Sequence, residues 1–159
     1  IESFHLFLLY LGNLCYFGAF IAGIFFVYTF TVSTSILILL ILAETLSPLE
    51  IALIAGTGTV IGDLVIFHFV KDNLFNEIKE IYNKVDRKNY FKKLLHSKYF
   101  NWTLPIIGAI IIASPFPDEL GVSLMGLSKI STIKFIFISY LLNFIGLYII
   151  ISASILFKY

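Results

Sequence analysis

Long apolar segments dominate this sequence and limit its possible architecture. Residues 4–27, 51–70 and 130–157 each reach the roughly 20 apolar residues that a helix needs to cross a bilayer. The chain of 159 residues is 59% hydrophobic, whereas soluble domains contain about 45–50% apolar residues. The sequence therefore predicts an all-α integral membrane protein.

The first apolar segment is interpreted as a transmembrane helix. Residues 4–27 are longer than the core of a signal peptide, and Glu2 and His5 stand where a basic leader would be expected. We therefore expect an N-terminal transmembrane helix within residues 1–28.

Two shorter apolar segments end in a similar way. Residues 36–43 lead into a break with Ser47, Pro48 and Glu50, and residues 104–113 lead into a second break with serine, prolines and acids. Proline disrupts helices, and in lipid an irregular backbone is tolerated only beside protein or a watery cavity. Paired interruptions of this kind are a pointer to a transporter-type site. We predict two inverted-repeat halves, each a re-entrant helical hairpin plus a transmembrane helix, in residues 31–70 and 103–157.

The polar block at residues 71–102 predicts the topology. Its apolar residues recur at helical spacing, which predicts an amphipathic helical connector; a plain solvated connector is the alternative. Ten of the eleven basic residues lie in this block or at Lys129 and Lys134, so the positive-inside rule makes it cytoplasmic and the chain a multi-pass protein of the plasma membrane. The alternative fold has five ordinary spans with acidic loops, and it places Lys129 and Lys134 on the opposite side.

Carboxylates in or beside the apolar segments are the main candidate site residues. A charged side chain at the bilayer centre costs about 2.5–3.5 kcal/mol on insertion scales, and neighbouring acids can share a proton. Helix capping or a place in the first helical turn is the plainer interpretation of each. The candidates for substrate binding or proton coupling are Glu50, Asp63, Asp118, Glu119 and, at an interface, Glu44.

Other residues are expected to shape or flank the site. Gly58 and Gly62 form a Gly-x-x-x-Gly pattern typical of close helix packing, and Asn143 is expected to hydrogen-bond a hairpin backbone. The expected hairpin formers are Pro48, Pro115 and Pro117. Possible lipid-headgroup contacts are Lys71, Lys129 and Lys134, although the positive-inside rule alone explains them.

Composition excludes several classes of function. The net charge of +1 argues against nucleic-acid binding. One cysteine and isolated histidines give no metal-ligand spacing, so no metal or other cofactor is expected.

Residues 58–71 resemble a signature of the DedA family, also called the VTT or SNARE-associated domain family. The family pattern is G-x-x-x-G-D-x-x-x-Y-x-x-G-R; three positions match, two are replaced by similar residues and one departs from the pattern. These are Gly58, Gly62 and Asp63, then Phe67 and Lys71, and finally Val70.

The second half of the chain resembles a second signature of that family. Pro115 and Gly126 fit it, and Asn143-x-x-Gly146 resembles its N-x-x-G pattern but is displaced by about one turn. Asp118 and Glu119 stand where the family has Arg-Thr. The resemblance implies two inward-pointing re-entrant hairpins. It also implies movement of phospholipids or polyprenyl-phosphate carriers across the bilayer, with proton coupling through membrane carboxylates.

The leading hypothesis is therefore a lipid transporter or scramblase rather than an enzyme. Its expected partners are membrane lipids, protons and, by analogy with small transporters, a second copy of the chain. A small ion or drug exporter would use the same carboxylates, and a membrane scaffold would need none of them. An intramembrane aspartyl protease would use Asp63 and Asp118, but Val60 replaces the first glycine of its Gly-x-Gly-Asp motif.

Overall fold

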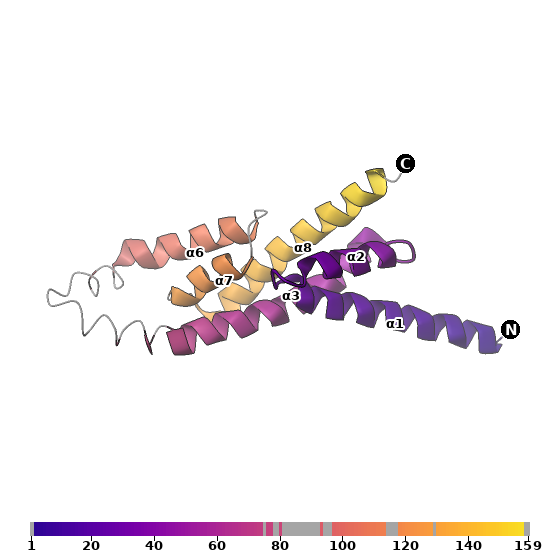
Figure 1. The fold of residues 1–159 in the computed structure, drawn as a ribbon, viewed down its shortest axis with the longest axis horizontal. Coiled ribbons are helices and arrows are strands. Elements are labelled where there is room, and N and C mark those ends of the chain that lie inside the picture. The colour runs from indigo at the N-terminus through magenta and orange to yellow at the C-terminus, as the bar shows by residue number, and fades with distance from the viewer. Residues whose placement is uncertain are drawn as a thin grey trace. The chain divides into compact units, whose positions relative to one another are not determined.

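The chain is all-helical over the part that the structure describes, which confirms the all-α part of the prediction. The computed structural model describes residues 2–74, 76, 77, 80, 93, 97–113, 118–128 and 130–157, with side chains from residue 14 onward apart from residue 74. The elements within these residues are α1 (Glu2–Phe26), α2 (Val32–Leu42), α3 (Pro48–Phe69), the π-helical segment η1 (Val70–Leu74), α6 (Lys98–Ile112), α7 (Asp118–Leu127) and α8 (Thr132–Phe157) (Figure 1).

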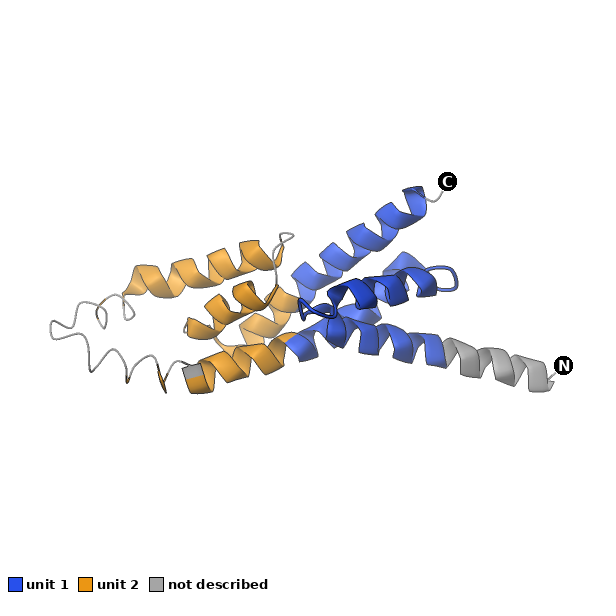
Figure 2. Cartoon of the chain, in the orientation of Figure 1, with its two compact units in different colours: residues 1–62, 140–159 blue, residues 63–139 orange. Residues whose placement is uncertain are grey.

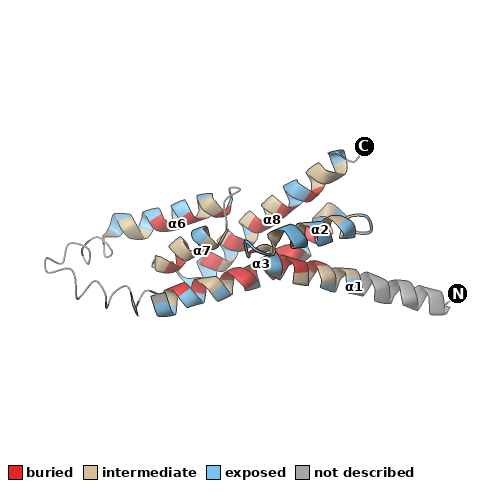
Figure 3. Cartoon of the chain, viewed as in Figure 1, coloured by how far each residue is buried: buried red, intermediate tan, exposed pale blue. Residues whose placement is uncertain are grey.

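Two of the described helices are long and apolar enough to cross a membrane. They are Pro48–Asn73, which joins α3 to η1, and Thr132–Phe157, which is α8. Both lie where the sequence predicted spans. α8 also exposes Ile133, Phe137 and Leu141, at steps of four residues that place them on one side of the helix. Each described helix carries buried and exposed residues (Figure 3).

Several predicted features fall outside the described residues. They are Pro115, Pro117, Lys129 and most of the connector at residues 71–102.

The chain forms two compact units (Figure 2). Unit 1 comprises residues 1–62 and 140–159, and unit 2 comprises residues 63–139. The boundary falls within α3 and within α8, so each of these helices contributes residues to both units.

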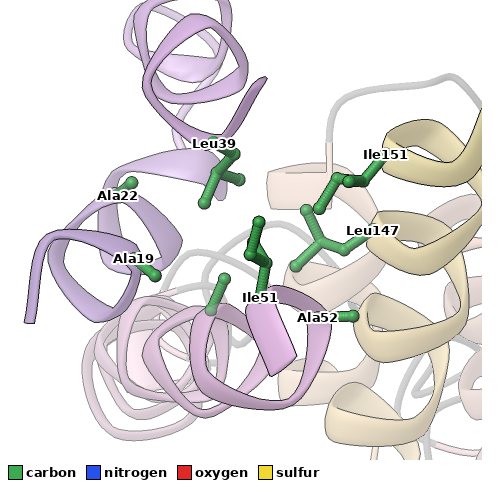
Figure 4. Close-up of a cluster of buried hydrophobic side chains, with 8 residues drawn as sticks. Ala19, Ala22, Leu39, Ile51, Ala52, Leu147 and Ile151 are labelled. Carbon is green, nitrogen blue, oxygen red and sulfur yellow. The ribbon is translucent and has the colours of Figure 1, made fainter. Parts of the chain in front are cut away.

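The core of unit 1 is built from α1, α2, the first part of α3 and the last part of α8. Alanines of α1 and α3 pack together with larger aliphatic side chains of α2, α3 and α8 (Figure 4). Small residues let helix backbones approach closely, which is the usual basis of helix association in membranes. The buried cluster is Ala19, Ala22, Leu39, Ile51, Ala52, Ala55, Leu147 and Ile151.

Glycines bring α1 and α3 into direct backbone contact within unit 1. A Cβ atom added to Gly58 would overlap the carbonyl oxygen of Phe20, and one added to Gly62 would lie 2.8 Å from the carbonyl oxygen of Ile24. The Gly-x-x-x-Gly face therefore lies against α1, and any larger side chain there would push the two helices apart.

The first half of the chain is simpler than a hairpin followed by a separate span. α2 has 11 residues, about 16 Å of helix, which is too short to cross a bilayer. After the turn at residues 43–47, α3 runs unbroken from Pro48 to Phe69, so any hairpin in this half consists of α2 and α3 themselves. Pro48 stands at the start of the helix, where its missing N–H group costs nothing.

Unit 2 contains a tight helical hairpin made by α6 and α7, which pack against each other. A Cβ atom added to Gly108 would lie 2.6 Å from the carbonyl oxygen of Gly121, and the converse distance is also 2.6 Å. At 15 and 10 residues, the two helices measure about 22 and 15 Å. Both are shorter than a span.

Candidate functional site

The candidate site lies where α3 and α8 pack against each other inside unit 2. Asp63 of α3 is completely buried and accepts a hydrogen bond from the hydroxyl of Ser139 of α8, which is also completely buried. One turn further along α3, the ring of Phe67 stacks on that of Phe135, with 4.1 Å between ring centroids. Each step of four residues forward on α3 corresponds to four residues back on α8, as expected for antiparallel helices.

The hydroxyl of Ser139 compensates part of the burial of Asp63. A buried carboxylate is costly unless hydrogen bonds or partner charges replace its water. The sequence did not single out Ser139, although its spacing from Asn143 is a usable signal. Ser139 and Asn143 are polar residues four apart in an apolar segment and therefore lie on one face, and both are buried.

Two further acids stand at the start of α7. Asp118 and Glu119 occupy its first turn, where the helix dipole favours negative charge. Both are half-buried, and Asp118 interacts electrostatically with Glu119 and with Asp63. The structure thus brings three of the five predicted carboxylates into one region of unit 2.

Glu50 has a different environment in unit 1. Its Oε2 atom accepts hydrogen bonds from the backbone N–H and the hydroxyl of Ser47, at 2.9 and 2.7 Å, and the Glu50 N–H donates to the Ser47 hydroxyl at 3.3 Å. This reciprocal arrangement is a capping box at the start of α3. The hydroxyl of Tyr16 on α1 donates to Oε1 at 3.3 Å, so Glu50 also ties α1 to this turn. Glu44 is exposed in the turn after α2.

The predicted glycines of α7 and α8 and the predicted lysines differ in how closely other atoms surround them. Gly126 of α7 lies against Val70, whose Cβ would be 3.1 Å from an added Cβ atom, whereas Gly146 of α8 has no atom within 4 Å of that position. Lys71 donates to the carbonyl oxygen of Ile130 at 3.2 Å, and Lys134 is exposed.

Metal binding finds no support in the part of the chain that is described. No group of three or more His, Cys, Asp or Glu residues there is arranged to hold an ion.

The chain matches no family model, no curated protein and no solved structure. The likeness to the DedA family therefore rests on the residues quoted for it. The site is interpreted from its own chemistry, which is a buried carboxylate–hydroxyl pair and a second acid, Asp118, whose charge the first disfavours.

Proposed function

We propose that this protein is a DedA-like lipid transporter or scramblase of the plasma membrane, and not an enzyme. The observation that carries the proposal is the burial of Asp63 in an apolar helix of spanning length, where it is hydrogen-bonded to Ser139 and acts electrostatically on Asp118. Ionisable residues inside membranes are rare, and they usually mark substrate or proton pathways.

Helix lengths support a site near the middle of the bilayer. Asp63 of α3 lies eight residues before Lys71 of η1, which corresponds to about 12 Å at the α-helical rise. The hydrocarbon core is about 30 Å thick. With the Lys71 ammonium at the headgroup boundary, Asp63 would lie close to the midplane.

The α6–α7 hairpin has dimensions that fit a re-entrant segment. Tyr99 and Trp102, near the start of α6, are 86% and 75% exposed, as expected of aromatic residues at a membrane interface. From Trp102 to Ile112, ten residues further on, the helix advances about 15 Å, which is half the hydrocarbon thickness. Such a hairpin would bring Asp118 and Glu119 to the depth of Asp63.

The chemistry of these groups fits the movement of lipid headgroups. A headgroup cannot cross hydrocarbon without polar partners, whereas acyl chains can remain in lipid. The hydroxyl of Ser139 and the carboxyl groups would supply polar contacts halfway across. Protonation of a carboxyl group removes its charge and therefore its cost in lipid, which is the basis for coupling transport to protons.

The test is lipid scrambling by the purified chain in liposomes that carry fluorescent phospholipids, with dithionite quenching of the outer leaflet. We expect wild-type protein to expose inner-leaflet lipid and Asp63→Asn to abolish most of this activity. Asp72→Asn is the matched control, because Asp72 lies nine residues further along and is exposed. Equal activity of wild type and Asp63→Asn would refute the proposal. Substrate-dependent proton flux without lipid movement would identify an exporter instead.

The electrostatic influence of Asp63 on Asp118 also favours a second candidate, an intramembrane aspartyl protease. Such enzymes rely on two aspartates that share a proton. The deciding measurement is cleavage of a transmembrane peptide in detergent. A protease would cleave it and would lose all activity in both Asp63→Asn and Asp118→Asn, whereas a lipid transporter would leave the peptide intact.

A further inference from the structure

A second line of side chains runs along α8, separate from the line that packs on α3. The contacts with α3 follow steps of four residues, at Phe135 and Ser139. The second line has steps of four, three and four residues, which is the alternation of d and a positions in a heptad repeat. That alternation keeps one side chain per turn on the contact line between two helices. We call these residues the outer seam; they are Phe137, Leu141, Phe144 and Tyr148.

The outer seam is largely uncovered. Its residues Phe137, Leu141 and Tyr148 are 71%, 56% and 43% exposed. Of the two helices long enough to span a membrane, α8 is also the less covered, since 28% of its apolar stretch is buried against 50% for Pro48–Asn73. Acyl chains can cover an apolar face, so the case for a protein partner depends on two further features of the seam.

The first feature is that the aromatic rings are held in place. The Phe144 ring lies between those of Tyr140 and Tyr148, with 6.2 and 6.3 Å between centroids and planes inclined by 16° and 19°. Gly56 of α3 lies against the base of this stack, because an added Cβ atom would be 3.4 Å from Tyr140 Cε2 and 3.7 Å from Phe144 Cβ. Ordered side chains lose little conformational entropy on association, so the rings form a surface prepared for another helix.

The second feature is the polar tips of this stack. Within the described residues the hydroxyl groups of Tyr140 and Tyr148 make no hydrogen bond. Under the proposed function Ser139 lies near the bilayer midplane, so the hydroxyl of the next residue, Tyr140, reaches hydrocarbon that contains no acceptor. A hydroxyl left unpaired in apolar surroundings costs about 1–3 kcal/mol. A neighbouring helix can supply the missing partners, whereas acyl chains cannot.

The outer seam is complementary to itself. The positive-inside rule gives every copy of the chain the same orientation, so a two-fold axis along the membrane normal brings equal positions together. In such a parallel pair a meets a and d meets d. The first three seam residues are apolar, and the hydroxyl of Tyr148 both donates and accepts. Lys134, the preceding position of the repeat, is exposed and ends the seam, because two ammonium groups would repel each other.

We propose that the outer seam of α8 is the interface of a parallel homodimer, in which the Tyr148 hydroxyl groups of the two copies hydrogen-bond to each other. From Phe137 to Tyr148 the seam measures about 16 Å, which is about half the hydrocarbon thickness. The proposal goes beyond the proposed function and rests on it only for the orientation of α8 in the bilayer. The sequence predicted a second copy by analogy and named no surface for it.

The first experiment locates the interface by cysteine cross-linking of the full chain in membranes, in a Cys15→Ser background with copper phenanthroline as the oxidant. Leu141→Cys lies on the outer seam. Ile149→Cys is the matched control, because Ile149 is 59% exposed, close to the 56% of Leu141, but occupies a b position outside the seam. A disulfide-linked dimer should form at least fivefold more in Leu141→Cys. Equal yields, or monomer alone in both variants, would overturn the interface.

The second experiment measures the affinity of the two copies by energy transfer between labelled chains in liposomes at decreasing protein-to-lipid ratios. Phe137→Ala should weaken association about tenfold, equivalent to about 1.4 kcal/mol. Tyr148→Phe keeps the ring and removes the hydroxyl, so it should weaken association about threefold. Ile149→Ala should associate like wild type. All three positions are exposed, so these variants should fold. Unchanged association in both Phe137→Ala and Tyr148→Phe would overturn the proposal.

Other outcomes separate the alternatives. Cross-linking to a different protein in cell membranes, together with a purified chain that stays monomeric in liposomes, would assign the seam to that protein and overturn the homodimer. A seam-dependent dimer that scrambles no lipid would refute the proposed transport while leaving the interface intact. A chain that scrambles lipid as a monomer would do the reverse.

Discussion

The contact between Gly108 and Gly121 leads to a prediction that can be worked out from distances. In Gly108→Ala the new methyl carbon would lie 2.6 Å from the carbonyl oxygen of Gly121, which is 0.8 Å short of the 3.4 Å at which ordinary contact begins. The Met125 Cγ atom is equally close. Met125 is fully buried and the Gly121 carbonyl belongs to a helix backbone, so neither can yield without moving α7 away from α6.

The expected loss follows from two opposing effects. Overpacking of a tight contact costs typically about 1–3 kcal/mol, while replacing glycine by alanine inside a helix gains about 1 kcal/mol. Gly146→Ala is the matched control, because it gains the same helix propensity at a position with no atom within 4 Å. The difference between the two variants therefore isolates the overpacking cost. For a chain of this size it corresponds to a difference in melting temperature of about 2–12 °C.

The assay is the apparent melting temperature of each variant in detergent, read as the loss of monodisperse protein on size-exclusion chromatography. Gly146→Ala should melt at or above the wild-type temperature, and Gly108→Ala clearly below the control. If the two alanine variants melt together, the close approach of α6 and α7 is refuted, and with it the short helical hairpin.

Three further predictions concern stability in the same assay. Ser139→Ala removes the hydroxyl that donates to the buried Asp63 and should lower stability by about 1–3 kcal/mol, an effect that Ser139→Thr should partly reverse; unchanged melting of Ser139→Ala would contradict the contact. Phe135→Ala removes the ring stacked on Phe67 and should cost about 3–5 kcal/mol; a loss below 1 kcal/mol would argue against this packing. Glu50→Ala removes one half of the capping box and should lower stability by about 0.5–2 kcal/mol. If it lowers stability no more than alanine does in place of an exposed acidic residue, the cap contributes nothing.

Much of the helical layout could be predicted from the sequence. The apolar segments at residues 51–70 and 130–157 correspond closely to α3 and α8, because a long run of apolar side chains without an internal proline specifies a helix locally. Pro48, predicted as a hairpin former, is the first residue of α3. These features depend on neighbours in the sequence, and so sequence alone reveals them.

Features that depend on distant contacts were harder to predict. The Ser47–Glu50 pattern is compatible with both a cap and a membrane site, and only the hydrogen bonds of the folded chain favour the cap. The partner of Asp63 could not be chosen among the hydroxyl groups of the chain, because the alignment of α3 with α8 is set by the packing of Phe67 on Phe135. The unbroken course of α3 likewise removed a separate hairpin arm that the symmetry of the two halves had suggested.

The four-residue steps along α3 and α8 have a mechanical consequence for transport. Asp63, Phe67 and Lys71 each meet a different kind of partner on or before α8, namely a hydroxyl, an aromatic ring and a carbonyl oxygen. A slip of one turn would oppose the carboxylate to a phenyl ring and separate the ammonium group from its acceptor. These three contacts therefore fix α3 and α8 in one alignment, and the two helices form a rigid pair. The α6–α7 hairpin is a second rigid pair, because its own two helices meet backbone to backbone at Gly108 and Gly121.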